Sequence, residues 1–250
     1  MTVAAPSARD AGRTERAQGR WQQAQYGELA WWRARSGSID PGFYRDRAQQ
    51  VRSLVGGRTA IDSTAKVLEV GSGAAGIVTH LAAGARFAID PLERYFSSVP
   101  SWRQARDPGV WYAAARAEEL PCRSRTFSLA VCDNVLDHCE DPSRALVQIN
   151  RALRPGGLLY LRVSVFNAWG WSVRRAAELL RIDERHPASF TMRSLRRISA
   201  ECGFRIVAVQ RHGRAGLWLR QVTSGRLRQI AAAMLFVVQQ PVALLLEADG

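Results

Sequence analysis

Apolar residues in the middle of the chain fall into short runs of strand length, separated by helical patterns or glycine-rich turns. The runs that predict strands cover residues 66–70, 86–89, 110–114, 127–132, 158–163, 204–209 and 217–222. The segments that predict helices between them cover residues 76–83, 92–102, 142–153 and 191–203. Strands and helices that alternate at this spacing form a sheet covered by helices on both faces. The pattern therefore predicts an α/β fold with a doubly wound, mostly parallel sheet.

Three segments outside this alternation predict additions to the main domain, which we place at residues 61–225. Residues 1–20 are rich in Ala, Arg, Gly and Ser without apolar periodicity, so they predict a disordered tail. Residues 21–60 carry aromatic and aliphatic side chains at helical spacing and predict an N-terminal helical cap of two helices. Residues 164–190 break the alternation after the fifth strand and predict an insertion, or lid, over the carboxyl edge of the sheet.

The C-terminal segment, residues 226–250, is predominantly apolar but is interrupted by the polar run Gln239-Gln240-Pro241. Its apolar stretch is at the short limit for a membrane span, and the polar interruption argues against one. Packing against the core is our first interpretation of this segment. Peripheral membrane contact and a homodimer contact are the alternatives.

Composition narrows the class of protein only slightly. The 250 residues are 47% hydrophobic and 23% charged, as in ordinary globular domains, and the formal net charge is +13. That charge comes almost entirely from Arg, because Lys66 is the only lysine, and it fits a solvated basic surface as well as an anionic partner. The four cysteines form no CxxC pair or zinc spacing, so no metal site is predicted. The N-terminus lacks the apolar core of a secretory signal, so we expect a cytoplasmic protein.

A glycine-rich turn follows the first predicted strand, in the sequence VLEVGSGAAG at residues 67–76. Glycines let a ligand approach the backbone, and a following helix would supply free N–H donors. Glu69 lies near the strand end, two residues before the first glycine, where it could face the ammonium group of a ligand. It would repel a dinucleotide pyrophosphate. Asp90 ends the second strand and could accept both hydroxyls of a ribose. These features predict an adenosine ligand and argue against an NAD(P) oxidoreductase.

The order of these motifs resembles the class I S-adenosylmethionine-dependent methyltransferases, of the methyltransferase 11 type. The segments that carry the resemblance are VLEVGSGAAG, AID at residues 88–90, and ARAEELPCRSRTFSLAVCDNVLDHCEDPSRALVQINRALRPGGLLYLRV at residues 115–163. The chain departs from the family pattern in having Ala75 and Arg116 where a glycine and an acid are common. The resemblance implies a Rossmann-like fold and S-adenosylmethionine as the cofactor.

The resemblance also implies a set of cofactor-binding residues. Those at the methionine end are Glu69, Gly71, Ser72 and Gly73. Asp90 holds the ribose, with Pro91 or Leu92 beside the adenine, and Ala117 and Glu118 meet the adenine edge. Asp133 and Asn134 lie near the methionine and the path of methyl transfer.

The acceptor is less determined than the cofactor. A base is needed only if the acceptor atom must lose a proton, and His138 and His186 are the candidates. Aromatic side chains could line the acceptor site, and the candidates are Trp31, Trp32, Tyr44, Phe166, Trp169 and Trp171. We expect transfer to an O or N atom of a small molecule, such as a saccharide, a lipid-linked or a natural-product intermediate. An RNA or protein methyltransferase and a non-catalytic cofactor-binding homologue are the alternatives; nucleic acid is disfavoured because no RNA-binding module is recognisable.

Overall fold

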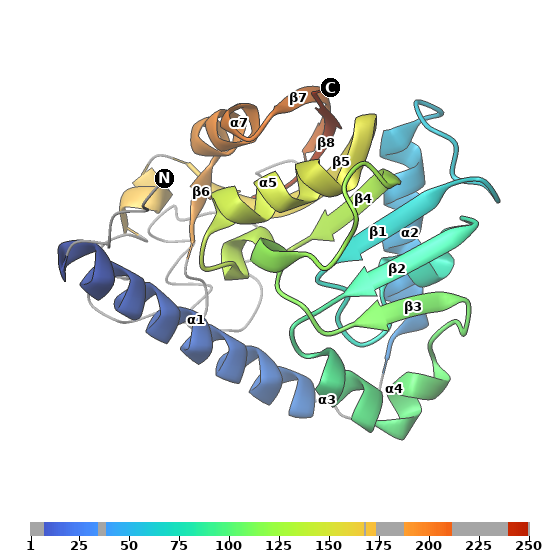
Figure 1. The fold of residues 1–250 in the computed structure, drawn as a ribbon, viewed down its shortest axis with the longest axis horizontal. Coiled ribbons are helices and arrows are strands. Elements are labelled where there is room, and N and C mark those ends of the chain that lie inside the picture. The colour runs from blue at the N-terminus through green and yellow to red at the C-terminus, as the bar shows by residue number, and fades with distance from the viewer. Residues whose placement is uncertain (1–7, 35–38, 168, 174–187, 212–239, 250) are drawn as a thin grey trace, which may run out of the picture.

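The computed structural model describes residues 8–34, 39–167, 169–173, 188–211 and 240–249 (Figure 1). Its centre is an eight-stranded sheet in the order β3-β2-β1-β4-β5-β8-β7, with β6 paired to β5. The strands are β1 Lys66–Val70, β2 Ala85–Ile89, β3 Val110–Ala113, β4 Phe127–Asp133, β5 Leu153–Phe166, β6 Phe190–Thr191, β7 Phe204–Arg211 and β8 Gln240–Ala248. All pairs are parallel except those that β8 forms with β5 and β7. The predicted mostly parallel α/β sheet is therefore confirmed.

Helices cover both faces of the sheet, as the apolar runs in the strands require. The α-helices are α1 Ala8–Arg33, α2 Pro41–Val55, α3 Glu93–Ser98, α4 Pro100–Gln104, α5 Pro142–Ala152 and α7 Met192–Glu201. On one face, α5 and α7 pack on side chains such as Leu68 and Leu161. On the other face, α2 packs on side chains such as Val67 and Tyr160. The predicted Thr191 cap begins α7 through a capping box with Ser194.

The connections after β1 and β2 differ from the predicted helices. The segment after the glycine turn forms only the 3₁₀ helix η1, Ile77–His80, because the positive φ of Gly76 delays regular helical geometry. The predicted helix over 92–102 is divided into α3 and α4, since Pro100 begins a new helix. Both changes leave the carboxyl ends of β1 and β2 at the same edge of the sheet.

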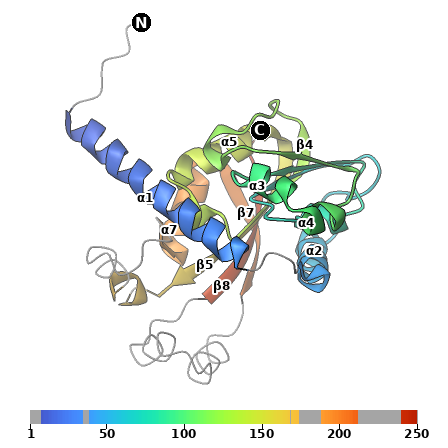
Figure 2. The same cartoon turned by 90° about the horizontal axis from the view of Figure 1, so that it is seen from below.

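The N-terminal segment is helical where a disordered tail was predicted. Helix α1 begins at Ala8, so the prediction of a tail over residues 1–20 is wrong from residue 8 onward. The helix runs across the carboxyl edge of the parallel strands, and two views at right angles agree on this (Figures 1 and 2). Its end is fixed by Trp32, which packs on the buried pair Phe96 and Trp102 of α3 and α4. Helix α1, which we call the roof helix, therefore covers one edge of the sheet, whereas α2 packs on a face.

The end of the chain is an interior strand and not a separate segment. Strand β8 lies between β5 and β7, and Leu244, Leu245 and Leu246 are fully buried. The proposed boundary at residue 225 is therefore wrong, and residues 240–248 are not available for a membrane or dimer contact. Residues 226–239 and the predicted strand at 217–222 lie outside the described residues. No helix in the described part of the chain is long and apolar enough to cross a membrane.

The predicted insertion begins later than expected, because β5 continues to Phe166. Most of it, residues 174–187, lies outside the described residues. Exposed Trp169 and Trp171 belong to the short described stretch at 169–173.

Candidate functional site

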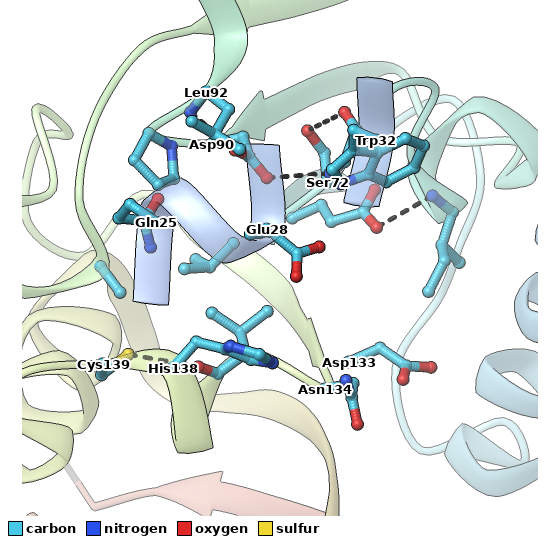
Figure 3. Close-up of a pocket in the computed structure, with 18 of the residues that line it drawn as sticks. Gln25, Glu28, Trp32, Ser72, Asp90, Leu92, Asp133, Asn134, His138 and Cys139 are labelled. Carbon is cyan, nitrogen blue, oxygen red and sulfur yellow. Dashed lines mark hydrogen bonds between the residues drawn. The ribbon is translucent and has the colours of Figure 1, made fainter. Parts of the chain in front are cut away.

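A cavity of about 1110 Å³ lies between the carboxyl edge of the strands and the helices α1 and α2. In a sheet of this kind, ligands bind at the carboxyl ends of the strands, beside the point where the strand order reverses. All eleven predicted cofactor residues line this cavity. Figure 3 shows Asp90 and Leu92 on one side, with Asp133, Asn134 and His138 on the other. Glu28 of α1 lies between the two sides.

Asp90 is placed by two backbone N–H groups that bind its two carboxylate oxygens. Leu92 N donates to Oδ1 at 2.8 Å and Gly73 N donates to Oδ2 at 2.9 Å. Burial raises the pKa of Asp90 to about 6, although these hydrogen bonds oppose the shift. Each oxygen keeps a second lone pair, so the carboxylate can still accept the two hydroxyls of a ribose.

The glycine turn brings backbone close to the cavity but offers fewer free donors than predicted. Gly71 N and Ser72 N both donate to the carbonyl of Ile89, at 2.7 and 3.2 Å, and Gly73 N is held by Asp90. Gly71 has a φ of +76°, and a β-carbon there would overlap the side chain of Val135. The turn therefore allows a ligand to come close to the backbone, and it positions Asp90. The expectation of free N–H donors at a helix start is wrong for the N–H groups of Gly71, Ser72 and Gly73.

Glu69 lines the cavity but is almost completely buried, at 2% exposure. Its carboxylate accepts Ile77 N at 2.9 Å and Val78 N at 2.8 Å, so it fixes the first turn of η1. Burial raises the pKa of Glu69 to about 8 against the effect of these hydrogen bonds. A β-carbon at Gly76 would lie 2.8 Å from Oε2, which explains why a glycine stands there. The predicted contact with a ligand's ammonium remains a prediction.

The predicted adenine end is built from the 3₁₀ helix η2, Ala117–Glu119, and from α1 above it. Glu118 is buried and accepts the backbone N–H of Glu140 at 2.8 Å. Arg116, the unusual residue of the sequence pattern, pairs with Glu140 at 2.6 Å and stacks on the ring of Trp21, 4.0 Å from its centroid. The substitution in the family pattern therefore connects the roof helix to the adenine end.

Asp133 ends β4 and Asn134 follows it, at the floor of the cavity. Asn134 adopts a left-handed conformation with a φ of +60°, which asparagine tolerates better than most residues. Its N–H donates to the carbonyl of Arg162 at 2.8 Å. Asp133 forms ion pairs with Arg162 at 3.1 Å and with Arg47 at 3.5 Å. The two predicted residues are thus fixed to β5 and α2.

The two predicted histidines have different outcomes. His138 ends the 3₁₀ helix η3, Leu136–His138, lines the cavity, and has its Nε2 4.0 Å from an oxygen of Asp137. His186 lies outside the described residues. Among the predicted aromatic walls, Trp31, Trp32 and Tyr44 line the cavity. Phe166, Trp169 and Trp171 are not among its lining residues.

Polar lining residues that the sequence reasoning missed include Gln25, Glu28, Arg47 and Arg162. The first three lie on helices whose packing the sequence did not reveal. Arg162 could have been recognised as a site residue, because it is a charged residue in the apolar run LLYLRV, near the carboxyl end of a predicted strand. No group of three or more His, Cys, Asp or Glu side chains that could hold a metal ion occurs among the described residues.

These residues fit S-adenosylmethionine. Asp90 offers a carboxylate to a diol, Glu28 and Glu69 offer acidic groups to an ammonium, and the cavity is large enough for a cofactor with an acceptor beside it.

Comparison with known sequences identifies the family. The model of a methyltransferase domain, the methyltransferase 23 family, matches residues 43–209. An uncharacterised methyltransferase of Mycobacteroides abscessus is 32% identical over 103 residues, which are 40% of this chain and 40% of that protein. The alignment thus spans about two fifths of the curated relative.

Solved structures share the fold. Geranyl diphosphate C-methyltransferase from Streptomyces coelicolor, in complex with S-adenosylhomocysteine, superposes with a TM-score of 0.62 at 11% identity, over 81% of this chain and 79% of that one. Phospholethanolamine N-methyltransferase 2 of Haemonchus contortus, also with S-adenosylhomocysteine, superposes with a TM-score of 0.55 at 13% identity, over 80% of this chain and 52% of that one. Both were crystallised with the product form of the predicted cofactor.

Proposed function

This chain belongs to the methyltransferase-domain family, and on that premise we propose that it methylates an O or N atom of a small-molecule acceptor. S-adenosylmethionine supplies an activated methyl group, so displacement from its sulfonium needs mainly a correctly placed acceptor atom. Asp90 would orient the ribose, and the turn at Gly71 would allow the methionine end to lie against the backbone. The acceptor class and the acceptor atom are the parts of this function that we propose.

The aromatic lining of the cavity supports the choice of a small molecule. The roof helix α1 contributes Trp21, Trp31 and Trp32 to the lining, and α2 contributes Phe43 and Tyr44. An aromatic cavity between a sheet edge and two helices, with a few polar groups in its lining, is typical of a small-molecule site. The two structural relatives described above are named for small-molecule acceptors, which supports the same choice.

His138 is our candidate for the base that removes a proton from the acceptor. It lines the cavity on the side opposite Asp90, and Asp137 lies next to it in the chain and in space (Figure 3). A carboxylate near an imidazole stabilises the protonated ring that forms after proton removal. An acceptor whose nucleophile carries no proton would not need this group, so the effect of replacing His138 reports the acceptor chemistry.

The experiment is an acceptor screen with a radiolabelled methyl donor, beginning with hydroxyl and amine compounds of saccharide, lipid-linked and natural-product type. We expect transfer to one class of small molecule, with kcat reduced about 100-fold or more in His138→Ala for a hydroxyl acceptor. Labelling of RNA or protein by the purified enzyme would instead support the macromolecular alternative. Tight cofactor binding without transfer to any acceptor would support the non-catalytic alternative.

A further inference from the structure

Three charged side chains meet on the cavity floor away from the predicted adenine end. Arg47 comes from α2, Asp133 ends β4, and Arg162 lies on β5. Asp133 Oδ1 accepts a hydrogen bond from Arg162 Nη1 at 3.1 Å, and Asp133 Oδ2 lies 3.5 Å from Arg47 Nε. All three side chains are largely buried, with 9% to 16% exposure. Two cations against one anion leave the cluster with an excess positive charge.

Within the described part of the chain, hydrogen bonds use only a few of the N–H donors of the two guanidinium groups. A guanidinium has five N–H donors, yet Arg162 donates only to Asp133, and Arg47 donates only to Gln50 Oε1, at 2.9 Å. The hydroxyl of Tyr160 is buried without a hydrogen-bond partner in the same part of the chain. This tyrosine interacts electrostatically with all three charged side chains. Asp133 Oδ2 likewise has no hydrogen-bond partner there. The remaining guanidinium N–H groups of Arg47 and Arg162 line the cavity and are the donors that an anionic group of a ligand could use.

Among the described residues, no acidic side chain other than Asp133 forms an ion pair with Arg47 or Arg162. Both oxygens of the nearby Glu69 are held by backbone N–H groups of η1. Asp46 acts on Arg47 as well, but its side chain is exposed. Arg47 is further positioned by Phe43, whose ring centroid lies 5.1 Å from its guanidinium carbon, and Phe43 also lines the cavity. The guanidinium of Arg47 is therefore held beside the cavity.

We propose that Arg47 and Arg162 form a subsite for an anionic group, a phosphate or carboxylate, of the methyl acceptor. This inference rests on the proposed small-molecule function. The cofactor has a carboxylate of its own, so the position of the cluster matters. Asp90, the predicted ribose ligand, directly follows β2, whereas Arg162 lies on β5, three strands away in the order β2-β1-β4-β5. At about 4.8 Å per strand the two strands are about 14 Å apart, so the subsite lies away from the ribose, beside Asp133 at the methionine end.

The test titrates inorganic phosphate into the protein saturated with S-adenosylhomocysteine. Arg162→Gln should weaken phosphate binding at least tenfold while leaving affinity for S-adenosylhomocysteine within about threefold. Asp133→Asn should tighten phosphate binding, because it removes the competing negative charge; a merely structural role for Asp133 would not produce a gain. Arg197→Gln, the same charge change at a side chain 76% exposed on α7, is the control and should bind phosphate as the wild type does.

Two results would overturn the subsite. One is no saturable phosphate binding by a wild type that binds S-adenosylhomocysteine. The other is a tenfold loss of affinity for S-adenosylhomocysteine in Arg162→Gln that is absent with its decarboxylated analogue, which would assign the guanidinium to the cofactor carboxylate. A wild type that fails to bind S-adenosylhomocysteine contradicts the proposed function instead, and phosphate titration of the free protein then still decides the subsite.

Discussion

The side chain of Val135, just after β4, occupies the space that a β-carbon on Gly71 would fill. Gly71 also has a φ of +76°, which side-chain-bearing residues rarely adopt. The turn between β1 and η1 is therefore fixed by two independent constraints on one residue. The backbone position of Gly71 and of the neighbouring Ser72, two of the predicted cofactor residues, therefore depends on the contact with Val135.

Replacing Gly71 by Ala should lower the free energy of unfolding by about 2 to 4 kcal/mol, from backbone strain and from overpacking against Val135. The control is Gly57→Ala, because Gly57 has nearly the same φ, +77°, but open space around its β-carbon position. Gly57→Ala should lose only about 1 kcal/mol. Urea denaturation of both variants measures the difference, and equal losses would show that Val135 plays no part.

Cofactor affinity should rise with pH between 5 and 7.5. Burial raises the pKa of Asp90 to about 6, and ribose hydroxyls bind the ionised carboxylate better than the acid. Binding therefore lowers this pKa and releases a proton, so affinity falls as the pH drops below about 6. At pH 5 the affinity for S-adenosylhomocysteine should be about tenfold lower than at pH 7.5.

Calorimetric titration across this range, in buffers of different ionisation enthalpy, measures both affinity and proton release. Asp90→Asn keeps the shape of the side chain and should give a weaker affinity with a flatter pH dependence. A wild-type affinity that does not change, or proton uptake on binding, would contradict this role of Asp90.

The contact between Trp21 and Arg116 should contribute to cofactor affinity through the roof helix. Trp21→Ala and Arg116→Ala should each weaken binding of S-adenosylhomocysteine about threefold to tenfold, and the double variant should lose little more than either single one. Tyr26→Ala is the control, since Tyr26 is on the same helix, 73% exposed and absent from the cavity lining. Fully additive losses in the calorimetric titration would mean that the two residues act independently.

Strand β8 should be essential to the stability of the domain. Leu244 is fully buried between β5 and β7, so Leu244→Ala should cost about 2 to 4 kcal/mol of unfolding free energy. Val147→Ala, at a side chain 48% exposed on α5, should cost less than about 0.5 kcal/mol. Thermal or urea unfolding of the two variants checks this difference. A small effect at Leu244 would contradict the interior position of the last strand.

The sequence predicted the parallel core and the cofactor edge because local patterns encode both. The run at residues 66–70 and its glycine turn identify the first strand, and Asp90 marks the end of the second. It did not predict β8, because a buried strand of nine residues and a short apolar helix share the same composition. Arg47 and Glu28 were missed because their positions depend on how α2 and α1 pack on the sheet, and not on their neighbours in sequence.

The most direct test of the account is calorimetric titration of the purified protein with S-adenosylmethionine, S-adenosylhomocysteine and NAD. We predict micromolar binding of the two sulfur compounds and none of NAD, with affinity for both lost in Asp90→Ala while the protein remains folded. Binding of NAD, or no binding of either sulfur compound by the folded wild type, would contradict the assignment of the cavity as a methyltransferase cofactor site.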